Sequence, residues 1–233
     1  MKKPTKRNPQ PRTALLWALC TLFTLTLTAC LDDDDAQKPY PSLITELVEV
    51  NTNGRKQVST IVSDDGTIYM PTKTYGYSVA DTTFRALCAY EPLAGQSINV
   101  YQLQAIPAPK PLPPSSFNAL TKDPINIISV WNSPRYINVY FSYLTTHAAV
   151  HAVGFCEDSI TVSDDGLRTA HVSLLHSRPG EDAESYSEKT YICLPTYVYK
   201  DRCDSVALTI TTYRDEQTFG CRLPFDPKNN EMK

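Results

Sequence analysis

The histidines, which could bind a metal, all fall in the second half of the sequence. His147 and His151 are four residues apart, a spacing that suits a zinc site on a helix. The stretch AAVHAVGFC around them reads as a strand, along which four residues span about 13 Å. A metal-dependent hydrolase therefore stays an alternative that requires distant histidines to converge. The four candidates are His147, His151, His171 and His176.

Other catalytic patterns are missing from the sequence. It contains no G-x-S-x-G nucleophile elbow, no phosphate-binding Walker loop and no H-E-x-x-H zinc motif. The carboxylate pair Asp182 and Glu184 lies in a polar stretch that resembles a solvated loop. We therefore predict no catalytic residue, no bound metal and no cofactor, and expect the protein not to be an enzyme.

The pentapeptide VSDDG occurs twice, at 62–66 and 162–166. Asp and Gly tolerate the left-handed backbone of tight turns, and a Ser or Asp side chain can cap such a turn. A calcium loop would need oxygen ligands at alternating positions, but adjacent aspartates point to opposite sides of a strand. Both copies are therefore predicted to be hairpin turns.

Tyrosine is abundant, with 14 residues in the chain. Tyr75 and Tyr77 fall in a predicted loop, and Tyr136 and Tyr140 share one face of a predicted strand with Asn138. Exposed tyrosines can stack on sugars or enter pockets of a partner protein. These four tyrosines are the candidate ligand-binding residues, and a carbohydrate-binding module is an alternative function.

The elements that must position these residues are predicted to be strands throughout. In the first half, Asn53-Gly54 and Asp65-Gly66 punctuate short runs rich in β-branched and aromatic residues. About five strands in roughly 65 residues are typical of a small barrel such as the OB-fold. The predicted strands are 42–50, 56–62, 67–70, 83–90 and 96–106.

A proline-rich segment, 107–116, separates this barrel from the second half. Five of its ten residues are proline, which cannot donate the amide hydrogen bond of a central strand. About seven further runs follow, and Val206, Leu208 and Ile210 alternate with smaller or polar residues. This period of two predicts strands with one buried face, and their number fits a β-sandwich.

The N-terminal residues have the pattern of an export signal. Five basic residues precede a run of 14 apolar or small residues, 14–27, which is shorter than the roughly 20 needed for a membrane-spanning helix. Leu27-Thr28-Ala29-Cys30 resembles the lipobox of bacterial lipoproteins, which implies a covalent diacylglyceryl group on the sulfur of Cys30. The predicted divisions are a signal peptide at 1–29, an acidic tether at 30–39, an OB-like barrel at 40–106, the linker at 107–116, a β-sandwich at 117–227 and a tail at 228–233.

Charge and cysteine content narrow the possible partners and compartments. The chain has a net charge of −3, and removal of five basic and no acidic residues with the signal leaves −8. Such an acidic protein is a poor match for nucleic acid. Export permits disulfides, and Cys193 and Cys203 flank a predicted hairpin, so they are the tentative pair. Buried free thiols are the alternative.

Several short motifs together resemble the NigD-like lipoproteins of Bacteroidetes. They are the lipobox with its acidic tail, the first Asp-Asp-Gly, R-x-L-C-x-Y at 85–90, Asp-Pro-Ile at 123–125, and W-x4-Y-I-N at 131–138. The resemblance implies an N-terminal OB-like domain, a C-terminal β-sandwich and a role in bacteriocin immunity. It implies no reaction and no catalytic residues.

We therefore expect a lipid-anchored protein of the cell envelope that binds another macromolecule. The acidic stretch after Cys30 resembles one that implies routing to the outer membrane, on its cell-surface or periplasmic face. The anchor would hold the protein to the membrane through acyl chains such as palmitate. The expected partner is an envelope protein, a toxin or a glycan.

Overall fold

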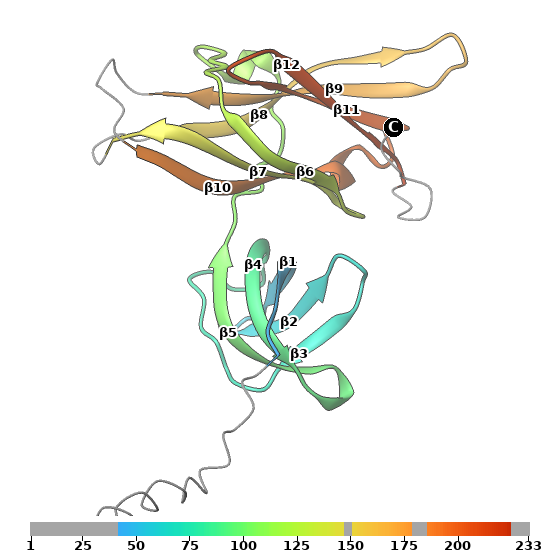
Figure 1. The fold of residues 1–233 in the computed structure, drawn as a ribbon. Coiled ribbons are helices and arrows are strands. Elements are labelled where there is room, and N and C mark those ends of the chain that lie inside the picture. The colour runs from blue at the N-terminus through green and yellow to red at the C-terminus, as the bar shows by residue number, and fades with distance from the viewer. Residues whose placement is uncertain (1–41, 147–150, 179–185, 225–233) are drawn as a thin grey trace, which may run out of the picture. The chain divides into compact units, whose positions relative to one another are not determined.

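The computed structural model of the protein describes residues 42–146, 151–178 and 186–224. These residues belong to the compact unit Ser42–Lys233. They form an all-β fold with a closed barrel followed by a two-sheet sandwich, which confirms the predicted fold class (Figure 1). The predicted signal peptide, the acidic tether, Cys30, His147 and the C-terminal tail lie outside the described residues.

Five strands close the barrel in the order β1-β2-β3-β5-β4. Pairing of β1 with β4 completes the closure, and β3 with β5 is the parallel pair. This order is that of the five-stranded Greek-key barrel predicted from the turn pattern. The strands are β1 (Ile44–Thr52), β2 (Val58–Ser63), β3 (Ile68–Pro71), β4 (Thr83–Pro92) and β5 (Ser97–Ala105).

Along β1 and β4, side chains point alternately into the barrel core and to the outside of the barrel. Val48 and Val50 of β1 join Ala86 and Cys88 of β4 in the barrel core. The residues between them, such as Leu47 and Glu49 or Arg85 and Leu87, point to the outside because successive side chains alternate. Opposite pairs in the ladder, Glu49 with Arg85 and Leu47 with Leu87, therefore form an outer patch on the barrel.

The sandwich consists of a three-stranded sheet, β10-β7-β6, and a four-stranded sheet, β12-β11-β9-β8. Within the second sheet, β9 and β11 run parallel. The seven strands match the predicted number in this half of the chain. They are β6 (Asn126–Asn132), β7 (Tyr136–Thr145), β8 (Ala152–Val162), β9 (Arg168–Ser177), β10 (Tyr186–Pro195), β11 (Ser205–Thr211) and β12 (Glu216–Arg222).

The hydrophobic core of the sandwich lies between the two sheets. Val206, Leu208 and Ile210 of β11 are fully buried there, as their alternation predicts. Strand β7 differs from that pattern, because Tyr136 and Asn138 are buried as well as Ile137 and Val139. A strand buried on both faces needs cover on its outer side, and the barrel provides it.

Both VSDDG copies are hairpin turns, which confirms the prediction. The first joins β2 to β3 and the second joins β8 to β9. Gly66 and Gly166 have φ of 87° and 86°, a left-handed conformation that favours glycine. In each copy the Ser hydroxyl donates to the second Asp, whose carboxylate also accepts the amide of the residue after Gly.

The proline-rich segment lies along the edge of the four-stranded sheet. The Leu112 amide donates to the Phe155 carbonyl at 3.1 Å, and the Leu112 carbonyl accepts the Glu157 amide at 2.9 Å. A short 3-10 helix, η2 (Pro114–Ser116), follows. The domain boundaries predicted from the sequence stay predictions.

Candidate functional site

The outer patch of the barrel packs against the outward face of β7 and β10. A small cluster of buried residues, here called the junction cluster, joins Leu47 and Ile106 to Tyr136 and Cys193. The Cys193 amide also donates to the Pro107 carbonyl at 2.9 Å. Because residues from both domains fill this cluster, the barrel and the sandwich share a continuous packed interface.

Arg85 is the centre of the polar contacts at this junction. Its guanidinium donates two hydrogen bonds to the Asp64 carboxylate, at 2.7 and 2.6 Å. The same group donates to the Asn138 side-chain oxygen at 3.2 Å and lies 4.5 Å from the centre of the Tyr136 ring. A single barrel residue therefore connects the first Asp-Asp-Gly turn with strand β7 of the sandwich.

The charge on Arg85 depends on Asp64, because Arg85 is only 1% exposed. Burial by itself would lower the pKa of Arg85, but the hydrogen bonds and the charge of Asp64 more than reverse this effect. Burial raises the pKa of the neighbouring Cys193 thiol to about 11, against the opposing influence of Arg85. At neutral pH Arg85 therefore stays charged and Cys193 stays a neutral thiol.

A second connection between the domains surrounds Glu49. Its carboxylate accepts hydrogen bonds from Arg135 Nε at 2.8 Å and from the Tyr136 hydroxyl at 2.7 Å. Arg135 also lies 4.4 Å from the centre of the Tyr197 ring. Burial, followed by the bond to Glu49, raises the pKa of Tyr136, so this hydroxyl remains a donor. The Arg135–Glu49 ion pair therefore joins the sandwich to the barrel, whereas Arg85 reaches the sandwich through Asn138 and the Tyr136 ring.

A groove runs along this junction on both sides of Pro134 and the Asp64-Asp65 turn. We call its two hollows, with volumes of about 500 and 260 Å³, the junction groove. The larger is lined by Thr45, Glu46, Leu47, Asp64, Asp65, Trp131, Asn132, Ser133 and Pro134. The smaller is lined by Glu49, Val62, Ser63, Asp64, Asp65, Gly66, Pro134 and Arg135.

The junction groove has the size and composition of a recognition site. Its larger hollow falls in the range of about 300–1,000 Å³ that is usual for ligand pockets, which often form between domains. Carboxylates, an aromatic side chain and a proline line it together. Its polar side chains are carboxylates, hydroxyls, one amide and one guanidinium. These groups can form hydrogen bonds and ion pairs with a bound partner.

The four tyrosines predicted to bind a ligand have different surroundings. Tyr136 is 4% exposed and belongs to the junction cluster, so it is not a surface residue. Tyr140 stacks on Tyr191, with ring centres 4.3 Å apart. Tyr77 stacks on Phe84 at 4.0 Å, and the Tyr75 hydroxyl donates to the Val100 carbonyl. The structure does not bring the four together into one surface.

The tentative disulfide between Cys193 and Cys203 is not formed in the structure. Both are free thiols, as are Cys88, Cys156 and Cys221. Cys193 lies in the junction cluster, whereas Cys203 packs in the core between the two sheets. The physical reason is that the segment between them is not a hairpin, because η3 (Thr196–Tyr199) connects β10 of the three-stranded sheet to β11 of the four-stranded sheet.

Three of the four histidines lie in the described part of the chain. His151 Nδ1 and His176 Nε2 are 2.9 Å apart, while His171 contacts the Thr161 hydroxyl at 2.8 Å. His171 and His176 are five residues apart on β9, about 17 Å along a strand. Within residues 42–146, 151–178 and 186–224, no group of three potential metal ligands is found. The structure therefore separates His171 from the other two.

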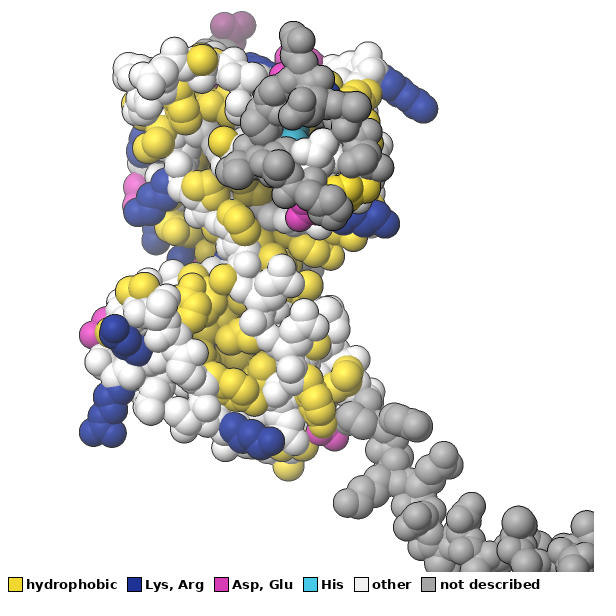
Figure 2. Space-filling view, turned by 90° about the vertical axis from the view of Figure 1, so that its left-hand side faces the viewer, with side chains coloured by type: hydrophobic (Ala, Val, Ile, Leu, Met, Phe, Trp, Pro, Cys, Tyr) yellow, Lys and Arg dark blue, Asp and Glu magenta, His cyan; other side chains and the backbone are white. Residues whose placement is uncertain are grey.

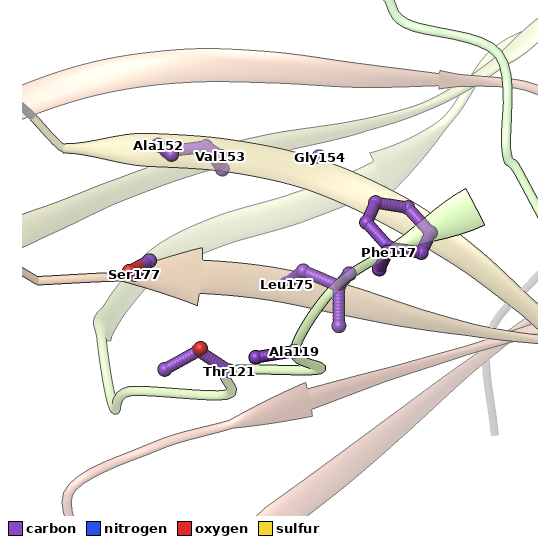
Figure 3. A pocket seen from close by; sticks show the side chains of 8 residues that line it. All are labelled: Phe117, Ala119, Thr121, Ala152, Val153, Gly154, Leu175 and Ser177. Carbon is purple, nitrogen blue, oxygen red and sulfur yellow. The ribbon is translucent and has the colours of Figure 1, made fainter. Parts of the chain in front are cut away.

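An apolar pocket lies on the four-stranded sheet, away from the junction groove. Its volume is about 170 Å³, and Figure 3 shows Phe117, Ala119 and Thr121 facing Val153 and Leu175. This volume is below the usual range of ligand pockets. Figure 2 shows hydrophobic side chains gathered over one face of the barrel as well. The pocket on the sheet has no charged side chain in its lining, unlike the junction groove.

Most of the residues that build the junction have no role predicted from the sequence. Arg85 belongs to a family motif, Asn138 to a motif and a predicted strand face, and Asp64 to a predicted turn. A single arginine inside the apolar run TFRALCAY was the available signal, because a charged residue in a strand of this kind needs a partner when buried. Apart from the family motif, the sequence around Trp131 has no feature that predicts its place in the groove.

A comparison with known protein families matches residues 109–223 to the NigD-like C-terminal beta sandwich domain. This match confirms the resemblance recognised in the sequence. A comparison with curated proteins found no match. No helix among the described residues is long and apolar enough to cross a membrane.

Three solved structures share the fold. A NigD-like immunity protein from Bacteroides caccae has a TM-score of 0.60 and 23% identity, covering 78% of this chain and 92% of that one. A protein described as toxin related, from Parabacteroides distasonis, has a TM-score of 0.61 and 16% identity, covering 77% and 92%. A protein described as a lipoprotein, from Bacteroides fragilis, has a TM-score of 0.56 and 11% identity, covering 77% and 97%.

Proposed function

We propose that this chain, whose residues 109–223 match the NigD-like C-terminal beta sandwich domain, is an envelope protein that acts by binding another protein. The observation that carries this proposal is the junction groove, built from both domains and held by the Arg85–Asp64 and Arg135–Glu49 ion pairs. A groove whose walls are fixed before binding loses little conformational entropy when a partner enters. The groove is the proposed binding site.

An immunity-like role against a protein toxin is the form of this function that we favour. Structures of the same fold include one named as an immunity protein and one described as toxin related. Immunity requires tight association and no chemical step, and a preformed groove with fixed charged and aromatic walls is suited to such association. The carbohydrate-binding alternative depended on exposed tyrosine faces, and burial of Tyr136 weakens it.

Site-specific photo-crosslinking in cells tests this function. A photoreactive amino acid replaces Thr45, an exposed residue of the larger hollow, in the full chain. The control replaces Leu167, which is 52% exposed at the second VSDDG turn. We expect one recurrent protein to be captured from position 45 and not from position 167. Capture of the same bystanders from both positions would contradict the proposal.

Anchoring through a lipid on Cys30 completes the proposed function. Cys30 follows a basic and apolar segment and precedes four consecutive aspartates. We propose that its thiol carries a diacylglyceryl group and holds the protein at the outer membrane. In cells fed labelled palmitate, the wild-type protein should be labelled and should sediment with membranes. The Cys30→Ser variant should lose the label, and retention of label would exclude Cys30 as the acceptor.

A further inference from the structure

The carboxylates of the junction groove are not all neutralised. Four of them line the two hollows: Glu46, Glu49, Asp64 and Asp65. Asp64 is paired with Arg85 at 2.6 Å, and Glu49 is paired with Arg135 at 2.8 Å. Among the residues that the structure describes, Glu46 and Asp65 have no cationic partner. The larger hollow therefore carries two uncompensated negative charges.

Hydrogen bonds hold these two charges in place. The Asp65 carboxylate accepts from the Ser63 hydroxyl and from the Thr67 amide at 2.8 Å. The bond from Ser63, followed by that from Thr67, lowers the pKa of Asp65, so the group is ionised at neutral pH. The Glu46 carboxylate accepts the Tyr90 hydroxyl at 2.6 Å. Both carboxylates are thus positioned from within the barrel.

The sandwich supplies an aromatic wall to the same hollow. Trp131 lines it and is half-buried, packing against the junction cluster. Its ring also meets the Tyr191 ring edge to face, with centres 6.4 Å apart, which restricts its orientation. Tryptophan is the best aromatic partner for a cationic side chain. An aromatic wall and two free carboxylates are the groups that recognise an ammonium or guanidinium ion.

We propose that the larger hollow of the junction groove receives a lysine or arginine side chain of the protein partner, between Glu46, Asp65 and Trp131. This inference rests on the proposed function and specifies the chemistry of the partner. Charge complementarity supports a basic segment, because the mature chain has a net charge of −8 and this hollow has an excess of two negative charges. A calcium ion fits this hollow less well than a basic side chain, because the Asp64 carboxylate is already paired with Arg85.

Tryptophan fluorescence tests the inference directly. Residues 31–233 include the whole compact unit Ser42–Lys233 and contain one tryptophan, Trp131, because the other, Trp17, precedes them. The probe is a hexalysine peptide, compared with hexaglutamate and with calcium chloride. We expect a saturable change with hexalysine only, and the affinity should fall as sodium chloride rises, because salt screens exposed charges.

The second VSDDG turn offers a matched control for charge. The Glu46→Gln, Asp65→Asn double variant should lose at least about tenfold in affinity for hexalysine, whereas Asp164→Asn, Asp165→Asn should stay within about twofold. Both variants remove two negative charges, and amides preserve the hydrogen-bond acceptors. Equal losses in both, or an equal response to calcium, would overturn the inference. Circular dichroism and urea unfolding confirm that each variant is folded.

The two proposals can fail separately. If Thr45 captures a recurrent protein in cells and the Glu46→Gln, Asp65→Asn variant captures it equally well, the cation site is wrong and the binding function remains. If no protein is captured from position 45, the binding function itself fails. If capture falls with this variant and not with the Asp164, Asp165 variant, both proposals are supported.

Discussion

The guanidinium of Arg85 in the barrel donates to the side-chain oxygen of Asn138 in the sandwich at 3.2 Å. Asn138 in turn donates to the Ser133 hydroxyl at 3.3 Å, at the turn between β6 and β7. Because Arg85 also donates to Asp64, the β2–β3 turn and the β6–β7 turn are connected through one buried side chain. Residues of both turns line the junction groove.

Loss of Arg85 should destabilise the protein far more than loss of a surface arginine. Arg85→Met leaves Asp64 and Asn138 without their donor, and removing one member of a buried pair costs about 3 kcal/mol. Arg202→Met is the control, because Arg202 is half-exposed and pairs with Glu157 at 3.0 Å. This control variant should lose less than about 1 kcal/mol of unfolding free energy. Urea unfolding measures the loss of stability in both variants, and equal losses would show that the Arg85 network contributes no more than a surface ion pair.

Stability should fall as the pH is lowered from 7 to 5. Burial lowers the pKa of His176 in the folded state, and the charge of His151 adds to this effect. The unfolded chain, with a His pKa of about 6.5, therefore takes up a proton before the folded chain does. The contribution of neutral His176 to stability is complete above about pH 6.5 and is lost as the pH falls toward the lowered pKa of His176.

Urea midpoints at pH 8, 7, 6 and 5 measure this dependence. His176→Gln should flatten it, whereas His171→Gln should leave it unchanged, because His171 lies apart from His176 and contacts Thr161. If the urea midpoint of His176→Gln changed with pH as steeply as that of the wild type, other groups would be responsible for the pH dependence.

The described cysteines should resist thiol reagents in the folded protein. All five are buried free thiols, and burial raises the pKa of Cys88 to about 12 and that of Cys221 to about 11. Protected thiols form little thiolate at pH 8. Residues 31–233 should therefore show no reaction with a chromogenic disulfide reagent until guanidinium is added, and then five thiols. Only three thiols after unfolding would indicate one disulfide among these five cysteines, and peptide mapping would then test the Cys193–Cys203 pairing.

Replacing the turn glycines should have similar effects in both VSDDG copies. Gly66→Ala and Gly166→Ala place a Cβ in open space, so the cost comes from φ alone, about 1 kcal/mol each. Gly220→Ala in β12 is the control, because its backbone is not left-handed. Thermal unfolding at one pH compares the three. A loss confined to Gly66→Ala would mean that the two turns are not equivalent.

Local patterns in the sequence were sufficient for the fold class. The alternation of Val206, Leu208 and Ile210 reflects side chains that point to alternate faces, a property of each strand by itself. The same holds for both VSDDG turns, whose hydrogen bonds join residues within five positions of one another. The expectation of an exposed Tyr136 was wrong because alternation cannot reveal what covers the outer face of a sheet.

The two identical pentapeptides show which features the local sequence determines and which depend on distant residues. Their sequences determine the same turn, with the same Ser-to-Asp hydrogen bond and the same left-handed glycine. Only Asp64 meets a buried arginine, while Asp164 has no ion-pair partner among the described residues. Turn geometry follows from a few adjacent residues, whereas an ion pair requires a partner from a distant strand. The sequence by itself therefore determined the strands and turns, and the tertiary structure decided which of them form the junction groove.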